Sequence, residues 1–200
     1  MKWFNIFSPK SEPKENVESK PKRASEIQDK LLADRIIFLG TPIDDVVANE
    51  VIAKLLYLEH RSSTEDINLY INSPGGAVTA TLAIHDTIKY IKPDVATVCI
   101  GQASGVAALL IASGTKGKRF AQPSSRFLLN RLTGGKATHG ENIITHQNEL
   151  ERMKRLLVKA FVEETGKSPK IFLKALAHEV ILSPEEALEY GLIDEILKKK

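Results

Sequence analysis

Two glycine-rich segments contain residue types that could bind a peptide carbonyl or hold a nucleophile. Residues 101–105 read Gly-Gln-Ala-Ser-Gly and stand between an apolar β-branched stretch and a helical pattern of small residues. Because the N-terminus of a helix stabilises negative charge, this segment is suited to a nucleophile. Residues 73–76 read Ser-Pro-Gly-Gly, and the outward N–H groups of such a turn can hold an extended peptide or an oxyanion. An ordinary strand-to-helix turn explains residues 73–76 equally well.

A serine nucleophile requires a general base, and histidine is the usual one. The five histidines are His60, His85, His139, His146 and His178. His139 and His146 are seven positions apart and would share one face of a helix. Two histidines without a third ligand make a weak case for a metal site. We therefore expect no bound metal, and no segment predicts a cofactor.

Strands and helices alternate along the chain, and this alternation positions both glycine segments. The expected strands are residues 36–39, 68–71, 95–100, 119–121 and 127–129. The expected helices are residues 44–58, 78–91, 105–113, about 140–165 and one that begins after Ser183. Strands that alternate with helices pair in parallel through right-handed crossovers. The pattern therefore predicts the α/β fold class.

The segment at about 140–165 is the longest helical pattern, and Gly166 ends it. At 1.5 Å per residue this helix would be roughly 40 Å long, more than one small domain can cover. Either another subunit covers it, or it lies along its own sheet. The sequence favours neither explanation over the other.

Charge and composition define the ends of the domain. The formal net charge is +3, with lysines concentrated at both ends. A nucleic-acid-binding protein would carry a basic stripe interleaved with aromatic residues, and this sequence shows none. Residues 1–25 are rich in Lys, Glu, Ser and Pro, which predicts a disordered or variable tail, and 198–200 form a basic end. The domain is expected at 26–197. The single cysteine, Cys99, and the lack of a long apolar run favour a reducing compartment and no membrane span.

Five motifs resemble the Clp protease proteolytic subunit family (ClpP, peptidase S14). They are Ile-Asn-Ser-Pro-Gly-Gly at 71–76, Ile-Lys-Pro-Asp at 91–94, Gly-Gln-Ala at 101–103, Gly-Lys-Arg-Phe at 117–120 and Glu-Tyr-Gly-Leu-Ile-Asp at 189–194. Their order and spacing match the family over about residues 26–197. The resemblance implies a ClpP/crotonase-like fold of repeated ββα units, with a protruding handle segment at about 134–165.

The family uses a Ser–His–Asp triad, and the matching positions here have lost the necessary groups. The nucleophile position falls on Gly105, the base on Asn130 and the acid on Glu179. Glycine has no nucleophile, and an amide does not accept a proton near neutral pH. Ser104 is the fallback nucleophile. Neighbouring residues on a helix point in different directions, so its side chain would not point where a side chain at position 105 does. His178 would lie near this site by analogy with the family, although a polar histidine at a ring contact explains it better.

Other family positions predict peptide binding and docking. The resemblance implies an oxyanion or peptide-binding site at Gly75, Gly76 and Val106. It also implies an unfoldase-docking surface at Tyr70, Val98, Ile100, Phe120 and Leu197. Asn68 and Gln122 replace residues that are often apolar in the family, so the docking pocket is expected to be altered. The alternative is that these strand residues are simply core.

The leading hypothesis is a non-catalytic, ClpR-like pseudoprotease that forms heptameric rings with catalytic ClpP paralogues. Its expected partners are those paralogues, an AAA+ unfoldase of the Clp type and polypeptide substrates, with no nucleic acid and no membrane. One alternative is a weak or unusual serine endopeptidase that uses Ser104. Another is a stand-alone peptide-binding scaffold. A cytoplasmic location is expected, with the plastid stroma as the alternative.

Overall fold

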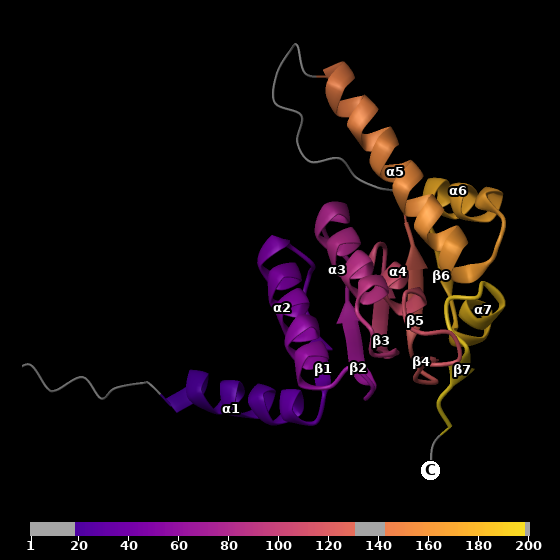
Figure 1. The fold of residues 1–200 in the computed structure, drawn as a ribbon. Coiled ribbons are helices and arrows are strands. Elements are labelled where there is room, and N and C mark those ends of the chain that lie inside the picture. The colour runs from indigo at the N-terminus through magenta and orange to yellow at the C-terminus, as the bar shows by residue number, and fades with distance from the viewer. Residues whose placement is uncertain (1–18, 131–142, 199–200) are drawn as a thin grey trace, which may run out of the picture.

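The computed structural model describes residues 19–130 and 143–198. The strands are β1 (Ile36–Leu39), β2 (Ile67–Ser73), β3 (Val95–Ser104), β4 (Arg119–Ala121), β5 (Arg126–Leu129), β6 (Val180–Leu182) and β7 (Glu195–Ile196). The helices are α1 (Ser19–Ala33), α2 (Asp45–Arg61), α3 (Val78–Tyr90), α4 (Ala107–Ala112), α5 (Ile143–Thr165), α6 (Pro169–His178) and α7 (Pro184–Glu189). This alternation confirms the predicted mixed α/β class (Figure 1).

One sheet unites the strands of the described ranges. Its main path runs β1-β2-β3-β4-β7 with parallel pairing throughout, as the alternation of strands and helices predicts. The C-terminal part of β3 turns to a second parallel partner, β5, and β5 pairs with β6 in the antiparallel sense. The strand β3 is therefore the central element, because it supports two branches of the sheet.

The two faces of the sheet differ in burial. Along β2, Leu69 and Ile71 are fully buried, whereas Tyr70 between them is half-buried on the other face. Helix α4 covers the buried face, where the hydroxyl of Thr97 donates a 2.7 Å hydrogen bond to the carbonyl of Ile111. In Figure 1 the helices α2, α3 and α4 lie side by side along the sheet. The core therefore lies between the sheet and this helical layer.

Capping residues set several helix boundaries. The side chain of Asp44 accepts a hydrogen bond from the N–H of Val47 and begins α2. Ser183 and Glu186 form a capping box at the start of α7, as expected for a helix that follows Ser183. A further helix, α6, is absent from the sequence prediction. Ser168 caps it, and its Phe172 stacks on Phe161 of α5 with ring centroids 4.8 Å apart.

The first part of α5 extends beyond the rest of the protein (Figure 1). Residues 145–149 are exposed on every side, and burial begins at Met153. The C-terminal half of this helix therefore packs on its own domain, and the cover of its first part by another subunit stays a prediction. Part of the predicted handle segment, residues 131–142, lies outside the described residues.

The described chain begins within the segment that composition predicts as a tail. Helix α1 begins at Ser19, so it includes residues that composition assigns to the tail at 1–25. Residues 1–18 and 199–200 lie outside the described residues. None of the helices in the described ranges has both the length and the apolarity that a membrane crossing requires.

Candidate functional site

The turn between β3 and α4 has the geometry of a nucleophile elbow, but its tip is bare. Gly105 sits at this turn with a φ of +57°, a conformation that favours glycine. Its N–H donates a 2.6 Å hydrogen bond to the carbonyl of Leu128 on β5, which fixes the turn against that strand. A Cβ atom added at Gly105 would lie 2.8 Å from Oδ1 of Asn130. Any side chain at position 105 would therefore point at the side chain of residue 130.

The third expected position lies at the same end of the sheet. Leu129 pairs with Val180 in the antiparallel β5–β6 ladder. Asn130 follows Leu129 and Glu179 precedes Val180, so Asn130 and Glu179 lie at the same end of the antiparallel ladder. Glu179 is exposed and has a φ of +50°. Within the described residues its carboxylate makes no hydrogen bond or ion pair, so nothing orients it toward Asn130.

Ser104 is positioned for structure and not for attack. It is the last residue of β3, whereas the sequence predicts a strand that ends at residue 100 and a helix that begins at residue 105. Gly105 lies beyond the strand in a turn with a φ of +57°, so helical spacing does not relate the directions of these two residues. The Ser104 side chain is buried, with a relative exposure of 3%, and its Oγ donates to Oε1 of Gln102 at 3.2 Å. His178, the histidine expected nearby, is an exposed residue at the end of α6.

The turn after β2 lies against the elbow, as close as backbone allows. A Cβ atom at Gly75 would lie 2.6 Å from the carbonyl oxygen of Ser104 and 3.6 Å from the N atom of Val106. Gly75 has a φ of +92° and accepts a hydrogen bond from the N–H of Ile43. Across residues 19–130 and 143–198, neither the Gly76 N–H nor the Val106 N–H has a hydrogen-bond acceptor. Two neighbouring turns thus carry free donors that could bind a carbonyl oxygen.

The expected docking residues form a row across the sheet. Tyr70, Val98 and Phe120 are register partners on β2, β3 and β4, and Phe38 of β1 continues the row. Phe38 is 49% exposed and Val98 is 5% exposed, so the row opens toward β1. Of the other two expected residues, Ile100 is half-buried on β3 and Leu197 follows β7, where its N–H donates to Ala121. The row faces away from α4.

Other chemistry has little support at this site. Cys99 is buried in β3, and burial raises the pKa of its thiol to about 12, so it stays protonated near neutral pH. In the described part of the chain, no group of three or more His, Cys, Asp or Glu side chains could hold a metal ion. The site therefore consists of backbone donors, one amide and one carboxylate.

A strand-to-helix elbow beside free backbone donors is the arrangement that serine peptidases use. Here the elbow lacks its side chain. A family model described as Clp protease matches residues 19–200, so the chain belongs to the Clp protease family. It is built as a proteolytic-subunit domain of that family, whose members assemble as oligomers of ClpP-type subunits and work with Clp ATPases.

Proposed function

We propose that this chain is a non-catalytic, ClpR-like subunit of a Clp protease core, which forms heptameric rings with catalytic ClpP paralogues. One observation carries the proposal. The position that faces the expected base is Gly105, and the expected base is Asn130. The elbow is therefore present without a nucleophile, and the residue opposite it cannot remove a proton.

The missing groups account for most of the rate enhancement of a serine protease. In a subtilisin-type enzyme, loss of the nucleophilic serine alone lowers turnover by about 10⁶-fold. Asn130 carries an amide, which is neutral and has no proton affinity near pH 7. Ser104 does not replace the nucleophile, because its hydroxyl is buried and bonded to Gln102.

The backbone donors give the subunit a role with polypeptides that does not require cleavage. The free N–H groups of Gly76 and Val106 can bind a peptide carbonyl, and the exposed turn at Gly76 leaves room for an extended chain. A ring that contains this subunit would then hold polypeptide substrates but cut them at fewer positions.

Assembly features belong to the same proposal. The projecting α5, with the segment from about 134, would act as the handle that joins two rings, within a crotonase-like arrangement of repeated units. The row of Phe38, Tyr70, Val98 and Phe120 would receive an apolar segment of an AAA+ unfoldase. A cytoplasmic location, with the plastid stroma as the alternative, remains a prediction.

The test is purification of the chain with and without a catalytic paralogue from the same cell. The mass of the intact complex is measured, and a serine-directed fluorophosphonate probe counts the reactive serines in each ring. Casein digestion with ATP and the unfoldase is measured in parallel. We expect a mixed ring in which every probe adduct lies on the paralogue.

Each rival hypothesis predicts a different outcome. A stand-alone scaffold would purify without the paralogue and would not join its rings. A weak peptidase would carry the probe on Ser104 and cleave peptides by itself. Either result would overturn the proposal.

A further inference from the structure

The row of side chains that runs from Phe38 to Phe120 lies on the face of the sheet opposite the helical layer. Alternate residues of a strand point to opposite faces. On β1, Ile37 and Leu39 are 1% exposed and belong to the core, whereas Phe38 between them is 49% exposed. A contiguous group of large apolar side chains at a surface marks a place where another apolar segment binds.

The row is open at one end only. Val98 is buried between its register partners Tyr70 and Phe120, so the row is closed toward the middle of the sheet. Phe38 belongs to β1, which ends the main path of the sheet. The ring of Phe38 lies over Gly40, because an added Cβ atom there would clash with it. The accessible end of the row is therefore the β1 edge of the sheet.

Helix α1 brings the start of the described chain to this same edge. It ends at Ala33, and the N–H of Arg35 donates to the carbonyl of Leu32 in a tight turn before β1 begins. In Figure 1 α1 extends from the β1 edge of the sheet, away from the other strands. The chain that precedes Ser19 is therefore attached on the side where the row is open.

The first residues of the chain include a short aromatic segment. Residues 3–7 read Trp-Phe-Asn-Ile-Phe. They contain three of the eight residues in the chain that are Trp or Phe, so aromatic side chains are concentrated there. Residues 8–18 read Ser-Pro-Lys-Ser-Glu-Pro-Lys-Glu-Asn-Val-Glu, in which Val is the only large apolar residue. An apolar segment is thus joined to α1 through a polar one.

The polar segment is long enough to return residues 3–7 to the row of the same chain. Its eleven residues span at most about 36–40 Å when fully extended. The 15 residues of α1 are about 22 Å long, and Phe38 lies about 7 Å further along β1. A segment tethered within reach of its site has an effective concentration that can be millimolar. A weak apolar contact is therefore sufficient.

We propose that residues 3–7 bind to the row of Phe38, Tyr70, Val98 and Phe120 of their own chain. Aromatic side chains gain from packing edge-to-face on other aromatic rings, in addition to being buried, and both partners are rich in them. Any other apolar segment must displace residues 3–7 before it can use this surface. The proposal goes beyond the proposed function, since it depends neither on the absence of catalysis nor on an unfoldase.

The fluorescence of Trp3 tests the proposal directly, because Trp3 is the only tryptophan of the chain. Acrylamide quenching is measured on the full-length chain in its purified assembly and on a synthetic peptide of residues 1–18. We expect weaker quenching and blue-shifted emission in the chain. Phe38→Ser should return both quantities to the values of the peptide. Leu173→Ser is the control, since Leu173 is 45% exposed on α6 and lies outside the row.

Three outcomes of the quenching experiment would overturn the proposal. In the first, Trp3 is as accessible in the chain as in the peptide. In the second, Phe38→Ser leaves its protection unchanged. In the third, Leu173→Ser removes the protection to the same extent as Phe38→Ser, which would mean that the loss is not specific to the row.

Photochemical cross-linking separates binding within one chain from binding between two copies. The photoreactive aromatic residue p-benzoylphenylalanine replaces Phe38, which keeps a large ring at this position even if Phe38→Ser does not fold. Assemblies are formed from equal amounts of isotopically heavy and light chains, and the cross-linked peptides are identified by mass spectrometry. We expect links from position 38 to residues 3–7 of a chain with the same label. Links that join heavy to light chains, or no links to residues 3–7, would overturn the proposal.

Discussion

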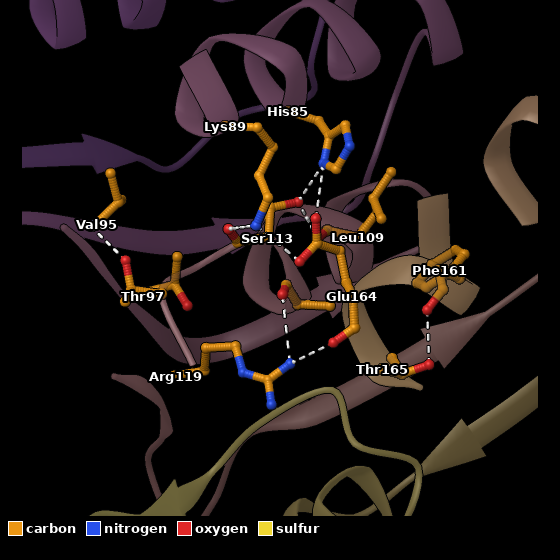
Figure 2. Close-up of polar contacts among 12 residues, drawn as sticks. His85, Lys89, Val95, Thr97, Leu109, Ser113, Arg119, Phe161, Glu164 and Thr165 are labelled. Carbon is orange, nitrogen blue, oxygen red and sulfur yellow. Dashed lines mark hydrogen bonds and ion pairs between the residues drawn. The ribbon is translucent and has the colours of Figure 1, made fainter. Parts of the chain in front are cut away.

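Two regions of this protein each contain a different part of a catalytic arrangement. One has the backbone of a nucleophile elbow without the side chains, and the other has serine, histidine and glutamate side chains in a buried place. At the β3–α4 turn the backbone is arranged for acyl chemistry, but positions 105 and 130 hold a glycine and an amide. At the base of α5 a serine, a histidine and a glutamate do meet, and Ser113 lies 2.8 Å from His85 (Figure 2). Yet Ser113 is fully buried, and its proton is bound to a carbonyl.

The comparison separates the groups of a catalytic triad from the conditions under which they act. A nucleophile must be exposed at a turn beside donors for the oxyanion. The cluster at His85 satisfies its own hydrogen bonds and stabilises packing. The turn at Gly105 has free backbone donors beside it but carries no side chain. The cluster at His85 is therefore structural, whereas the turn at Gly105 has groups that can bind a carbonyl oxygen.

The largest expected effect is a loss of stability at the base of α5, where Arg119 bonds the carbonyl of Glu164. The guanidinium of Arg119 bonds the carboxylate of Asp194 and the carbonyls of Glu164 and Gly191 from a buried position. Arg119→Met removes the guanidinium from all three acceptors and leaves the carboxylate of Asp194 with only the backbone N–H groups of Gly117 and residue 119. We therefore expect the free energy of unfolding to fall by about 3–5 kcal/mol. Urea denaturation measures it. Arg152→Met on the exposed face of α5 is the control and should have a far smaller effect. Comparable losses in both variants would contradict the structural role.

A smaller effect is expected where the turn after β2 meets the elbow. Gly75 and Gly117 both have positive φ, but a Cβ atom would strike the carbonyl of Ser104 at Gly75 and would meet open space at Gly117. Gly117→Ala should lower the free energy of unfolding by about 1 kcal/mol through backbone strain alone. Gly75→Ala should cost about 1–3 kcal/mol more, because the backbone must also move. Equal costs in urea denaturation would mean that the two turns are not in contact.

The smallest effect tests whether positions 105 and 130 face each other. An added methyl group in Gly105→Ala would lie 2.8 Å from Oδ1 of Asn130. Its cost should shrink when Asn130 is also changed to glycine, with a coupling energy of about 1 kcal/mol in a double-mutant cycle. The same cycle with Gln122, exposed after β4, is the control and should show no coupling. Strict additivity at Asn130 would contradict the predicted geometry.

Much of the fold follows from the sequence, because strand and helix patterns are local. The strands expected at 36–39 and 119–121 are β1 and β4, with unchanged bounds. Helix α6 escaped prediction although Ser168 and Pro169 form a recognisable start, because only ten residues follow before the next strand. The extension of β3 to Ser104 also escaped, since it depends on pairing with β5.

The same contrast between local patterns and contacts formed by folding applies to the turn at Gly105 and the cluster at His85. Family spacing assigns triad positions to Gly105 and Asn130, which lie close together in the structure, and their assignment as triad positions stays a prediction. The cluster of His85, Ser113 and Glu164 could not be found, because its members are 28 or more positions apart and only folding brings them together. A buried polar residue in a helix, such as His85 on the apolar face of α3, is the signal that was available.

The most direct test of the central claim is the reaction of the purified chain, alone, with a fluorophosphonate probe. The adducts are counted by mass spectrometry, and peptide turnover is measured in the same samples, with Ser104→Ala as the matched control. The account predicts no adduct and no turnover in either protein. An adduct on Ser104 with turnover that disappears in Ser104→Ala would contradict it.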